Sequence, residues 1–488
     1  MHTVYIYQIY HFFYLSFLKK LTINIYIDNF SLIIMYQPYV FKLESGKSDV
    51  LDKGPNKDNL ILSSTINLPL TSLGFHTFIH RTKNAMSITT NLQTENKFYY
   101  VVNPFEHIIL NYEDSLKNLT KLYLGIKEDS PDILSKSFYK LWEILFLFEV
   151  ANKKDLTYAA IAEESGAFIQ SVINYRQKLG SGISNDKIFG VTIHPEKGKY
   201  IEMGKQFMNF YNKQNSGLLN IHKTVSTVEA NKHKAKDNGD ITQVKTISLF
   251  KKDIEKTKVY ADLVTADGSL EWDDNNFQEQ EGYQLILGEI IAALRVQAKD
   301  GNFILKIFET FTLPSIKMVY LLSSFYEQTY IYKPFLSRIS NSEKYLICKG
   351  FKYDQKKDEA LLDKKIKTLE AILEGMNSMK YVFDIFPGLD LPSDYLDRFK
   401  FMNIKIANPQ QIMINNIVTY IKENNYYGEK YHAYREKQIN ATKWWVNNFY
   451  PPSSNLYVKN KEELQKLLKV SLEKFNIEQS KFISTLVK

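Results

Sequence analysis

Cysteine is almost absent from this chain, since Cys348 is the only one among 488 residues. A single cysteine cannot form a disulfide within the chain, and no cluster of Cys and His residues has the spacing of zinc ligands. His194 and His432 each lack a second histidine at ligand spacing. The composition therefore excludes a secreted fold held together by disulfides, argues against a structural metal site, and predicts a reducing compartment.

Long apolar segments are also missing, apart from one near the start. Residues 4–18 (VYIYQIYHFFYLSFL) contain Gln8 and His11 and are shorter than the ~20 apolar residues that span a bilayer. They lack the basic region and the small-residue cleavage site of a signal peptide. The segment from Met35 onward is typical of an ordinary protein start. We therefore interpret residues 1–34 as a translated leader or an over-long start, with a membrane anchor as the less favoured alternative, and we expect no stable membrane association.

Neither sign of charge dominates the sequence. The chain has 62 Lys and Arg against 54 Asp and Glu, a net charge of +8 at pH 7, which fits a polyanionic partner but is too small to prove one. Hydrophobic residues make up 44% of the chain, enough for a large core, and this excludes disorder as the main state. The 33 Tyr and 31 Phe are typical of an AT-rich gene, so a single aromatic residue only weakly indicates base stacking.

The pattern of polar and apolar residues divides the chain into four parts. After residues 1–34, an N-terminal accessory region covers 35–125 and includes a polar loop at 44–59. From 126 to 352, helical and strand patterns alternate, which predicts an α/β fold with a mostly parallel, doubly wound sheet. The remainder, 353–488, repeats leucines at helical spacing and is expected to be a mainly helical C-terminal accessory region.

Individual elements can be placed within residues 126–352. Helices are expected at 138–150, 168–175, 283–298 and 314–326. Strands are expected at 157–162, 261–266, 302–308, 328–332 and 344–348. In such a sheet the carboxyl ends of the parallel strands meet at one edge, where ligands bind.

The C-terminal region contains a mixed basic and aromatic segment at residues 420–454. A helical subdomain packed on the core and a nucleic-acid contact surface are equally consistent with this composition. Within the segment, Trp444 and Trp445 are more typical of a packed core than of an aromatic clamp for a base, which stays the second alternative.

Four polar residues lie in apolar surroundings at or near the ends of predicted elements. They are Lys140, Asp267, Lys306 and Glu343. Each one alone is most simply a surface lysine or a capping acid. Burying a charge is costly unless it is paired, and two lysines and two carboxylates can neutralise one another. We therefore predict that all four meet at one edge of the sheet.

A series of motifs around these residues is highly specific. Residues 261–351 contain DLVTADGS, NNFQEQ, GNFILKIFETFT, YLLSSFYEQTYIYKP and SRISNSEKYLICKGF in this order, and FYKLWEIL precedes them. The series resembles the FtsJ-type ribose 2′-O-methyltransferases, in particular the cap-specific mRNA 2′-O-methyltransferases of large DNA viruses. The resemblance implies a Rossmann-like methyltransferase fold, S-adenosylmethionine as the cofactor, and a Lys-Asp-Lys-Glu catalytic tetrad formed by Lys140, Asp267, Lys306 and Glu343.

The implied chemistry explains these residue types. A ribose 2′-hydroxyl is a poor nucleophile and needs a base within ~3 Å of its oxygen. We assign Lys306 as that base. Its pKa, ~10.4 when unperturbed, is expected to be lowered by burial, by Lys140 and by the positive sulfonium of the cofactor. Asp267 and Glu343 push this pKa the other way and are expected to orient the two amines. The mechanism requires no metal.

The cofactor site departs from the pattern of the family. The turn that relatives write as Glu-Gly-Pro-Gly-Gly-Phe is EESGAF here, and Glu164 and Ala167 are expected to narrow the pocket or to change the turn. Where relatives often carry an acid for the cofactor ribose, this chain offers only Thr192, and Asp240 is the candidate for the adenine amine. The resemblance implies the following cofactor-binding residues: Glu163, Ser165, Gly166, Ala167, Phe168, Asp240 and Asp267.

The loop after the strand at 328–332 also matches the family, where it borders the RNA. Lys333 and Arg338 are expected to meet phosphates. Asn341 and Ser342 are candidates to hydrogen-bond the ribose, although a loop-stapling role for Asn341 is an equal alternative.

The favoured interpretation is an enzyme that transfers a methyl group from S-adenosylmethionine to a ribose 2′-hydroxyl at the 5′ end of capped mRNA. Capped mRNA would be its partner, and other capping enzymes are further candidate partners. The expected location is the cytoplasm, or a viral factory or virion if a virus encodes the chain. One alternative is a cap-binding or RNA-binding subunit with a weakened cofactor site. Another is a 2′-O-methyltransferase for other RNA, such as ribosomal RNA, which would not need the long region after Gly350.

Overall fold

The computed structural model describes most of the chain. The described residues are 38–66, 73–92, 95, 97–106, 131–163, 165–178, 182–194, 205–214, 217–270, 274, 276–376, 381–451 and 454–486. The interpretation of residues 1–34 as a leader falls outside them. No helix within these ranges is both long and apolar enough to cross a bilayer.

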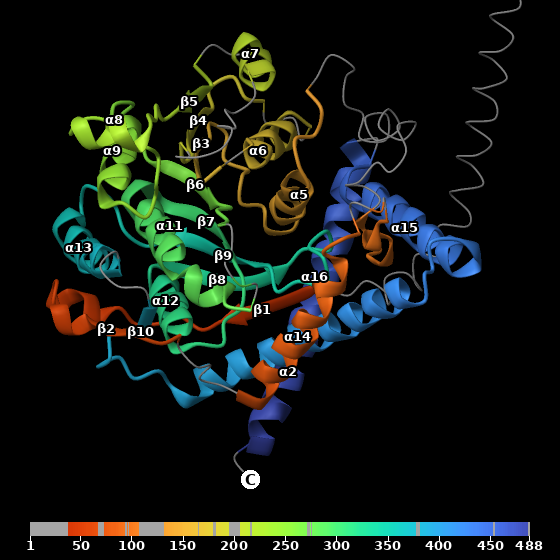
Figure 1. The fold of residues 1–488 in the computed structure, drawn as a ribbon. Coiled ribbons are helices and arrows are strands. Elements are labelled where there is room, and N and C mark those ends of the chain that lie inside the picture. The colour runs from red at the N-terminus through yellow and green to blue at the C-terminus, as the bar shows by residue number, and fades with distance from the viewer. Residues whose placement is uncertain are drawn as a thin grey trace, which may run out of the picture.

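An eight-stranded sheet forms the centre of the described structure, with the strand order β1-β8-β9-β7-β6-β3-β4-β5 (Figure 1). Strands β3 to β8 point the same way, whereas β1 and β9 pair antiparallel with their neighbours. The prediction of a mostly parallel sheet is confirmed. The strands are β1 Tyr39–Leu43, β3 Thr157–Ile161, β4 Lys187–Val191, β5 Leu219–Ile221, β6 Ala261–Ala266, β7 Gln297–Ile307, β8 Tyr326–Lys333 and β9 Lys344–Phe351.

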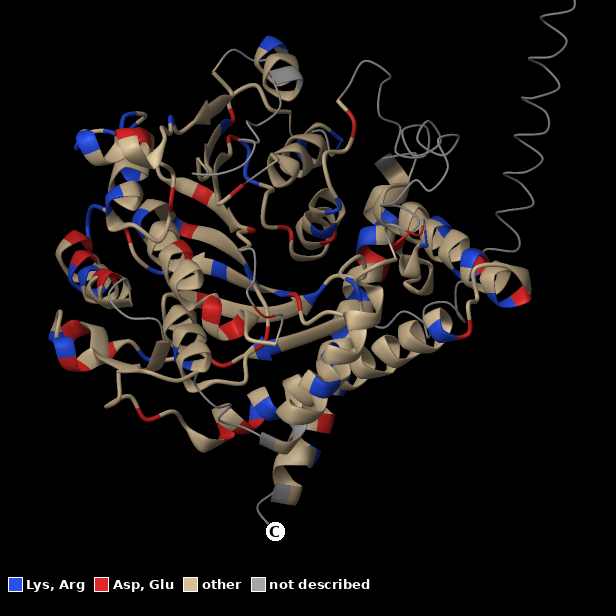
Figure 2. Cartoon of the chain, viewed as in Figure 1, with Lys and Arg blue, Asp and Glu red and all other residues tan. Residues whose placement is uncertain are grey.

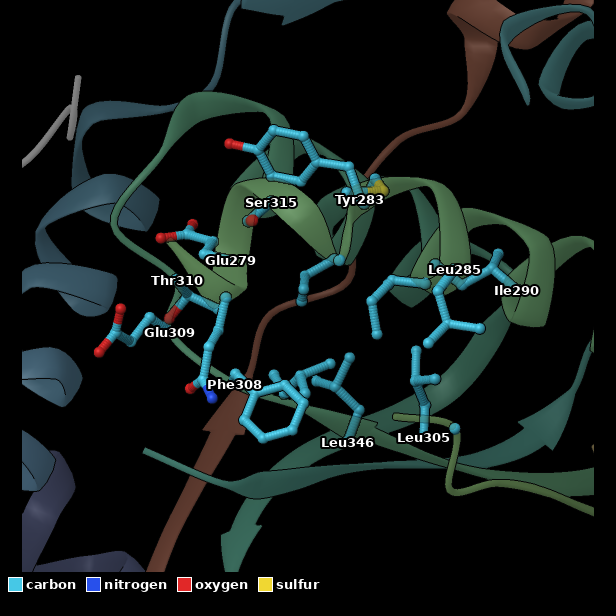
Figure 3. A pocket seen from close by; sticks show the side chains of 17 residues that line it. Glu279, Tyr283, Leu285, Ile290, Leu305, Phe308, Glu309, Thr310, Ser315 and Leu346 are labelled. Atoms are coloured by element: carbon cyan, nitrogen blue, oxygen red, sulfur yellow. The ribbon is translucent and has the colours of Figure 1, made fainter. Parts of the chain in front are cut away.

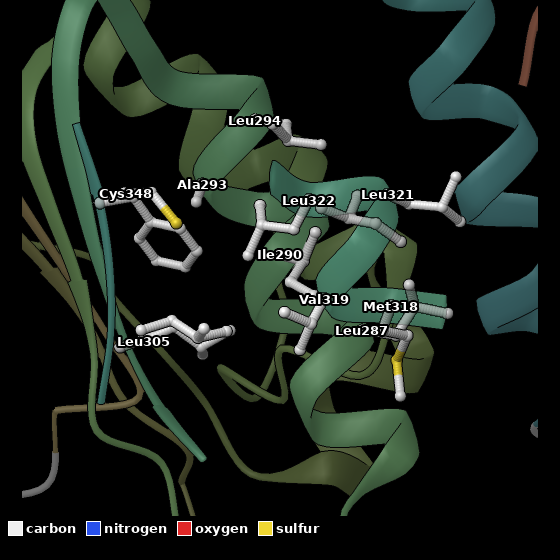
Figure 4. Close-up of a cluster of buried hydrophobic side chains, with 14 of the residues drawn as sticks. Leu287, Ile290, Ala293, Leu294, Leu305, Met318, Val319, Leu321, Leu322 and Cys348 are labelled. Atoms are coloured by element: carbon white, nitrogen blue, oxygen red, sulfur yellow. The ribbon is translucent and has the colours of Figure 1, made fainter. Parts of the chain in front are cut away.

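Helices cover both faces of this sheet, as a doubly wound fold requires. One face packs on α9 (Val244–Glu255), α11 (Tyr283–Val296), α12 (Leu313–Ser324) and α13 (Glu359–Met376). The other face packs on α5 (Ser137–Phe148), α6 (Ala167–Lys178), α15 (Gly428–Phe449) and part of α16 (Ser454–Leu486). Figure 4 shows Ile290, Ala293 and Val319 of the first helical layer on the side that faces Leu305 and Cys348 of the sheet.

Alternation along the strands decides which side chains reach which helical layer, because successive residues point to opposite faces. In β7, Phe303 and Leu305 belong to the core under α11 and α12, whereas Ile304 belongs to the core under α5 and α6. Lys306 has the same parity as Ile304, so it points toward α5. In β9, Tyr345 likewise lies in the core on the α5 side.

The boundary between α11 and β7 differs from the sequence prediction. A helix to residue 298 and a strand from 302 were expected, but α11 ends at Val296 and β7 begins at Gln297. Gln297 is fully buried, and its Nε2 donates to the backbone oxygens of Ala261 and Asn302. A register shift follows, and Asp300 has a φ of 62°. The side chain of Gln297 therefore stabilises an irregular start of the strand that periodicity does not reveal.

The flanking regions share sheets and cores with the central part of the chain. Strand β1 extends the main sheet beside β8, and α16 crosses it, with the ring of Phe475 4.8 Å from that of Phe41. A second, two-stranded sheet joins β2 (Leu60–Ser63) to β10 (Tyr381–Ile385). The proposed division at residues 34, 125 and 352 stays a prediction, although both flanks share sheets or cores with other parts of the chain. The described remainder includes α2 Leu73–Asn84, η4 Tyr99–Val102, α7 Lys205–Gln214, α8 Thr227–Lys232, α10 Gln278–Glu281 and α14 Ser393–Lys422.

The C-terminal region is helical, as predicted, and its two tryptophans are part of the core. Trp444 and Trp445 are both buried, and the Trp445 ring stacks on Phe449 with ring centres 5.3 Å apart. Its Nε1 donates to Glu143 at 2.8 Å. The core interpretation is therefore confirmed, and the alternative of an aromatic clamp is wrong because neither ring is accessible. On the outer faces of the helices, Lys and Arg are mixed with Asp and Glu (Figure 2).

Replacing Trp445 tests whether α15 is an integral part of the fold. Trp445→Ala is expected to lower the free energy of unfolding by about 3–5 kcal/mol, because it removes a buried ring and leaves Glu143 without one of its donors. The matched control is Tyr427→Ala, since Tyr427 lies near the start of α15 with 72% of its surface exposed; a change within about 0.5 kcal/mol is expected. Urea unfolding measures both, and equal effects would contradict the assignment.

Candidate functional site

Strand ends bring the predicted polar residues to one edge of the sheet. Asp267 follows directly after β6, and Lys306 is the penultimate residue of β7. Because β9 runs antiparallel to β7, its start lies at the same edge, and Lys306 pairs with Tyr345 in the register. Glu343, just before β9, therefore also reaches this edge. The fourth residue, Lys140, comes from α5, on the face of the sheet toward which Lys306 points.

The four side chains form two connected ion pairs. Lys140 Nζ donates to Glu343 Oε2 at 2.8 Å and lies 2.7 Å from Oε1. Lys306 Nζ donates to the backbone oxygen of Asp267 at 2.8 Å and lies 3.1 Å from its Oδ1. Tyr345 also donates its hydroxyl to that Oδ1 at 3.1 Å. The structure thus brings together all four residues that the sequence singled out, and their catalytic roles stay a prediction.

The two pairs influence each other electrostatically. Burial alone would raise the pKa of Glu343, but Lys140 and Lys306 outweigh it and lower the pKa to about 2. Burial alone would lower the pKa of Lys306, but Asp267 and Glu343 outweigh it and leave the pKa raised. The expectation that the surroundings of Lys306 lower its pKa is therefore wrong for the protein chain by itself. Asp267 and Glu343 act on the pKa of Lys306 more strongly than Lys140 does.

Lys333 does not lie where a phosphate contact needs it. It is buried, and its Nζ donates to the backbone oxygen of Glu343 at 2.8 Å and of Asn341 at 2.9 Å. It also donates to Asn341 Oδ1 and Ser337 Oγ. Burial lowers the pKa of Lys333 to about 7. The predicted phosphate contact is not supported by this placement, because Lys333 holds the loop before Glu343 from inside. Asn341 has the loop-stapling role, and Ser342 is buried beside it.

Arg338 is engaged by the N-terminal region. Its guanidinium donates through Nε and Nη2 to the carboxylate of Glu106, with contacts of 2.6–3.1 Å, and lies 4.2 Å above the ring of Tyr100. The backbone oxygen of Tyr100 in turn accepts from Gln438 of α15. A phosphate contact of Arg338 stays a prediction, and any such contact would meet a guanidinium that Glu106 already fixes in place.

The turn between β3 and α6 keeps its glycine where the backbone needs one. Among the described residues of this turn, φ is positive at Gly166, with 88°, and at Ala162, with 53°. Ala167 is the first residue of α6 and has no positive φ, so its methyl group adds no backbone strain. Phe168 donates its backbone N–H to Glu163 Oε1 at 3.2 Å. Ser165 comes directly before Gly166 in this turn, and Glu164 is outside the described residues.

The acids at the carboxyl ends of β3 and β6 suit a cationic ligand. Glu163 is fully buried, and burial together with Asp267 raises its pKa to about 8. A positive group bound near these acids would favour their ionised forms, so the donor set fits the sulfonium of S-adenosylmethionine. Asp240 lies in the loop before α9 and caps its own turn, since its Oδ1 accepts from the backbone N–H and the hydroxyl of Thr242. A contact of Asp240 with adenine stays a prediction.

A small cavity lies on the other face of the sheet from Lys140, under α11 and α12 (Figure 3). Its volume of about 30 Å³ has room for about two water molecules and not for a nucleoside. Phe308, Glu309 and Glu279 line it, whereas Lys140 and Glu343 do not. This cavity therefore does not correspond to the site at the sheet edge. Within the described ranges, no three His, Cys, Asp or Glu side chains are placed to hold a metal ion.

Two further charged residues, Lys136 at the N-cap of α5 and Glu143 within α5, lie one turn from Lys140 and were missed from the sequence. Lys136 lies one turn before Lys140, and burial, with Arg338 and Lys140 adding to it, lowers its pKa to about 8. Glu143 lies one turn after Lys140 and is fully buried; it accepts from Trp445 Nε1, Tyr332 Oη and the backbone N–H of residues 335 and 336. Helical spacing around Lys140 is the signal that could have found both.

The central part of the chain is similar to known proteins. Residues 133–351 match the family described as FtsJ-like methyltransferase. Cap-specific mRNA (nucleoside-2′-O-)-methyltransferase 2 of Drosophila melanogaster is 26% identical over 357 residues, which are 70% of this chain and 47% of that protein. Cap-specific mRNA (nucleoside-2′-O-)-methyltransferase 1 of Homo sapiens is 36% identical over 118 residues, which are 24% of this chain and 14% of that protein.

Among solved structures, a Plasmodium falciparum protein described as a ribosomal RNA methyltransferase shares 17% identity with a TM-score of 0.30, over 45% of this chain and 98% of that one. The chain spans about half the length of the Drosophila relative and a smaller share of the human one. The matched segment contains all four residues of the two ion pairs. Residues 133–351 are therefore similar to the FtsJ-like methyltransferases.

Proposed function

We propose that this chain is a cap-specific mRNA 2′-O-methyltransferase, which transfers a methyl group from S-adenosylmethionine to a ribose 2′-hydroxyl at the 5′ end of capped mRNA. The observation that carries the proposal is the two buried lysine–carboxylate pairs, Lys306 with Asp267 and Lys140 with Glu343, at the edge of the sheet where β6 and β7 end and β9 begins. The family match over residues 133–351 and the names of the Drosophila and human relatives support the same reaction.

The proton of the ribose hydroxyl is removed by Lys306. A base must lie within hydrogen-bond distance of that hydroxyl, and Lys306 Nζ is held at the sheet edge by the backbone oxygen of Asp267. Only the neutral amine can accept the proton. The raised pKa of Lys306 must therefore be lowered before the amine can act as a base. A positive charge bound beside Asp267 lowers it, because it disfavours the charged form of the lysine. S-adenosylmethionine supplies the electrophilic methyl group and also this positive charge.

The two carboxylates hold the two amines in place. Asp267 fixes Lys306, and Glu343 fixes Lys140 from the opposite side of the site. Glu343 remains ionised at all ordinary pH values, because its pKa is lowered to about 2. Lys140 thus stays paired while Lys306 changes its protonation state. This asymmetry keeps one ammonium next to the reacting oxygen and makes the other available as a base.

Contacts with RNA and with other capping enzymes belong to the proposal as well. Lys136 lies one turn before Lys140, is only partly exposed, and is better placed than Lys333 to meet a phosphate next to the reacting ribose.

The residues that bind the cofactor are proposed as Glu163, Ser165, Gly166, Ala167, Phe168, Asp240 and Asp267. The alternative of a binding subunit with a weakened cofactor site rests on the altered turn, and the positive φ of Gly166 and the unstrained backbone of Ala167 speak for the enzyme instead.

Substitution of Lys306 tests its role as the base. Lys306→Ala is expected to lower kcat for methyl transfer by at least about 100-fold, because the base is removed. Its affinity for S-adenosylmethionine, measured by calorimetric titration, is expected to stay close to that of the unchanged protein. Lys306→Arg is the charge-preserving control and should be equally inactive, since a guanidinium cannot release its proton. An Ala variant with most of its turnover would refute the assignment.

The rate of methyl transfer is expected to rise as pH increases from neutral to alkaline values. Lys306 must be deprotonated to act, and its pKa is raised by Asp267 and Glu343, so the neutral amine becomes more abundant at higher pH. A pH profile of kcat under saturating substrates measures this dependence. A rate that falls over the same range would show that Lys306 works in its charged form.

The cap requirement separates the proposed function from that of other RNA methyltransferases. A capped RNA oligonucleotide is expected to be methylated much faster than the same oligonucleotide without a cap. A radiolabelled methyl-transfer assay, followed by nuclease digestion, measures the rate and locates the label on the ribose. Equal rates on both substrates would favour an enzyme for other RNA, and folded protein that fails to bind S-adenosylmethionine would favour the binding subunit.

A further inference from the structure

A buried glutamate lies directly behind the site, on the opposite face of the sheet. Glu289 belongs to α11 and is fully buried. Its Oε1 accepts from the backbone N–H of Gly268 at 3.0 Å. Its Oε2 is also buried and has no hydrogen-bond partner among the described residues. Burying a carboxyl group with only one hydrogen bond costs free energy of folding. The presence of Glu289 at this position therefore calls for a functional explanation.

Glu289 and Lys306 hold the two ends of one peptide group. The carbonyl of Asp267 and the N–H of Gly268 belong to the same peptide bond. Lys306 Nζ donates to the carbonyl oxygen at 2.8 Å, and Glu289 accepts from the N–H at 3.0 Å. Because the peptide is planar and is hydrogen-bonded at both its carbonyl and its N–H, rotation would break both bonds, so the carbonyl stays directed at the lysine.

The peptide packs tightly on the side that faces Glu289 and Ala162. A Cβ atom at Gly268 would lie 2.4 Å from Glu289 Oε1 and 3.0 Å from the Cβ of Ala162. Ala162 itself begins the turn that leads to Glu163 and Gly166. Glu289, the peptide and the turn therefore fit together at contact distance, and a shift of the carboxyl group would move the peptide with it.

We propose that Glu289 is a positioning residue for methyl transfer, which fixes the Asp267–Gly268 peptide so that Lys306 Nζ is held at the reacting ribose oxygen. The proposal rests on the proposed function, because Lys306 is the base in that reaction. Glu289 does not touch the reacting groups in this assignment. It acts through the peptide, from the side of the sheet that the substrate does not reach.

Charge adds a second link between Glu289 and Lys306. Burial raises the pKa of Glu289 to about 8, and the nearby Lys306 opposes this shift. At pH 7 the carboxyl group is therefore mainly protonated, and a glutamine has nearly the same shape and keeps the acceptor oxygen. Above pH 8 the carboxylate favours the charged form of Lys306. Asp267 and Glu343 also favour the charged form of Lys306, and Glu163 at the end of β3 interacts with it electrostatically as well.

Two substitutions of Glu289 separate positioning from packing. Glu289→Leu removes the acceptor and is expected to lower kcat by roughly 10-fold to 100-fold, as a displaced catalytic group does, with KM for both substrates unchanged. Glu289→Gln keeps the acceptor and is expected to retain kcat at pH 7. In the Gln variant the rise of kcat with pH is expected to begin at lower pH, since no carboxylate then stabilises the charged lysine.

Glu279→Gln is the matched control. Glu279 is also a buried glutamate that accepts from backbone N–H groups, those of Phe311 and Thr312, but it does not contact the Asp267–Gly268 peptide. This variant is expected to leave the pH profile unchanged. A Leu variant that keeps the full kcat would overturn the proposal. If the Leu variant fails to fold, a Gln variant whose pH profile equals that of the unchanged protein overturns it.

A readout that does not need methyl transfer keeps this test separate from that of the proposed function. The pKa of the Lys306 amine can be followed from the pH dependence of its acylation, quantified by mass spectrometry of the peptide. Glu289→Gln is expected to lower this pKa, and Glu279→Gln to leave it unchanged. Should the protein transfer no methyl group to any RNA while the expected shift is found, the proposed function fails and the coupling stands. An unshifted pKa overturns the coupling.

Discussion

The need to pair buried charges governs the site. An isolated ammonium or carboxylate in a protein interior is too costly to persist, whereas two of each, held at hydrogen-bond distance, neutralise one another. The participants come from α5, from the ends of β6 and β7, and from the loop before β9, so the pairing also ties together distant parts of the sequence. The sheet topology is what makes this possible, because the antiparallel insertion of β9 beside β7 brings Glu343 to the carboxyl edge of the parallel strands.

The regions outside residues 133–351 contribute to the same arrangement. Glu143, one turn from Lys140 on α5, is buried with a pKa raised to about 7, and four donors surround it. One of them is Trp445 of the C-terminal region, and two are backbone groups of the loop after β8. Arg338 in that loop is held by Glu106 of the N-terminal region. Residues from both flanks thus fix the loop that ends at Glu343. This gives a reason why both flanks pack directly against residues 133–351.

Much of the site could be predicted from the sequence, because strand alternation and polar residues in apolar surroundings are local patterns. The placement of Lys140, Asp267 and Lys306 follows from them. The role of Lys333 could not be predicted, since a lysine after a strand is equally suited to solvent and to a loop that folds back over it. The direction of the Lys306 pKa also depends on distances to carboxylates from other segments. Glu289 is a single acid in an apolar helix, a signal that has meaning only once Gly268 is known to lie next to it.

The balance of charges explains how one architecture can hold both the ion pairs and a cationic cofactor. The two lysines and two carboxylates are neutral as a set. Glu163 and Glu289 flank them with pKa values raised to about 8, so both are largely protonated at neutral pH. Positive charge placed beside Asp267 favours the ionised forms of these acids and the neutral form of Lys306. Ionisation of the two acids and loss of a proton from Lys306 each reduce the local excess of positive charge. The site can therefore take up a cation without leaving an unpaired charge in its interior, and the same adjustment prepares Lys306 to accept a proton.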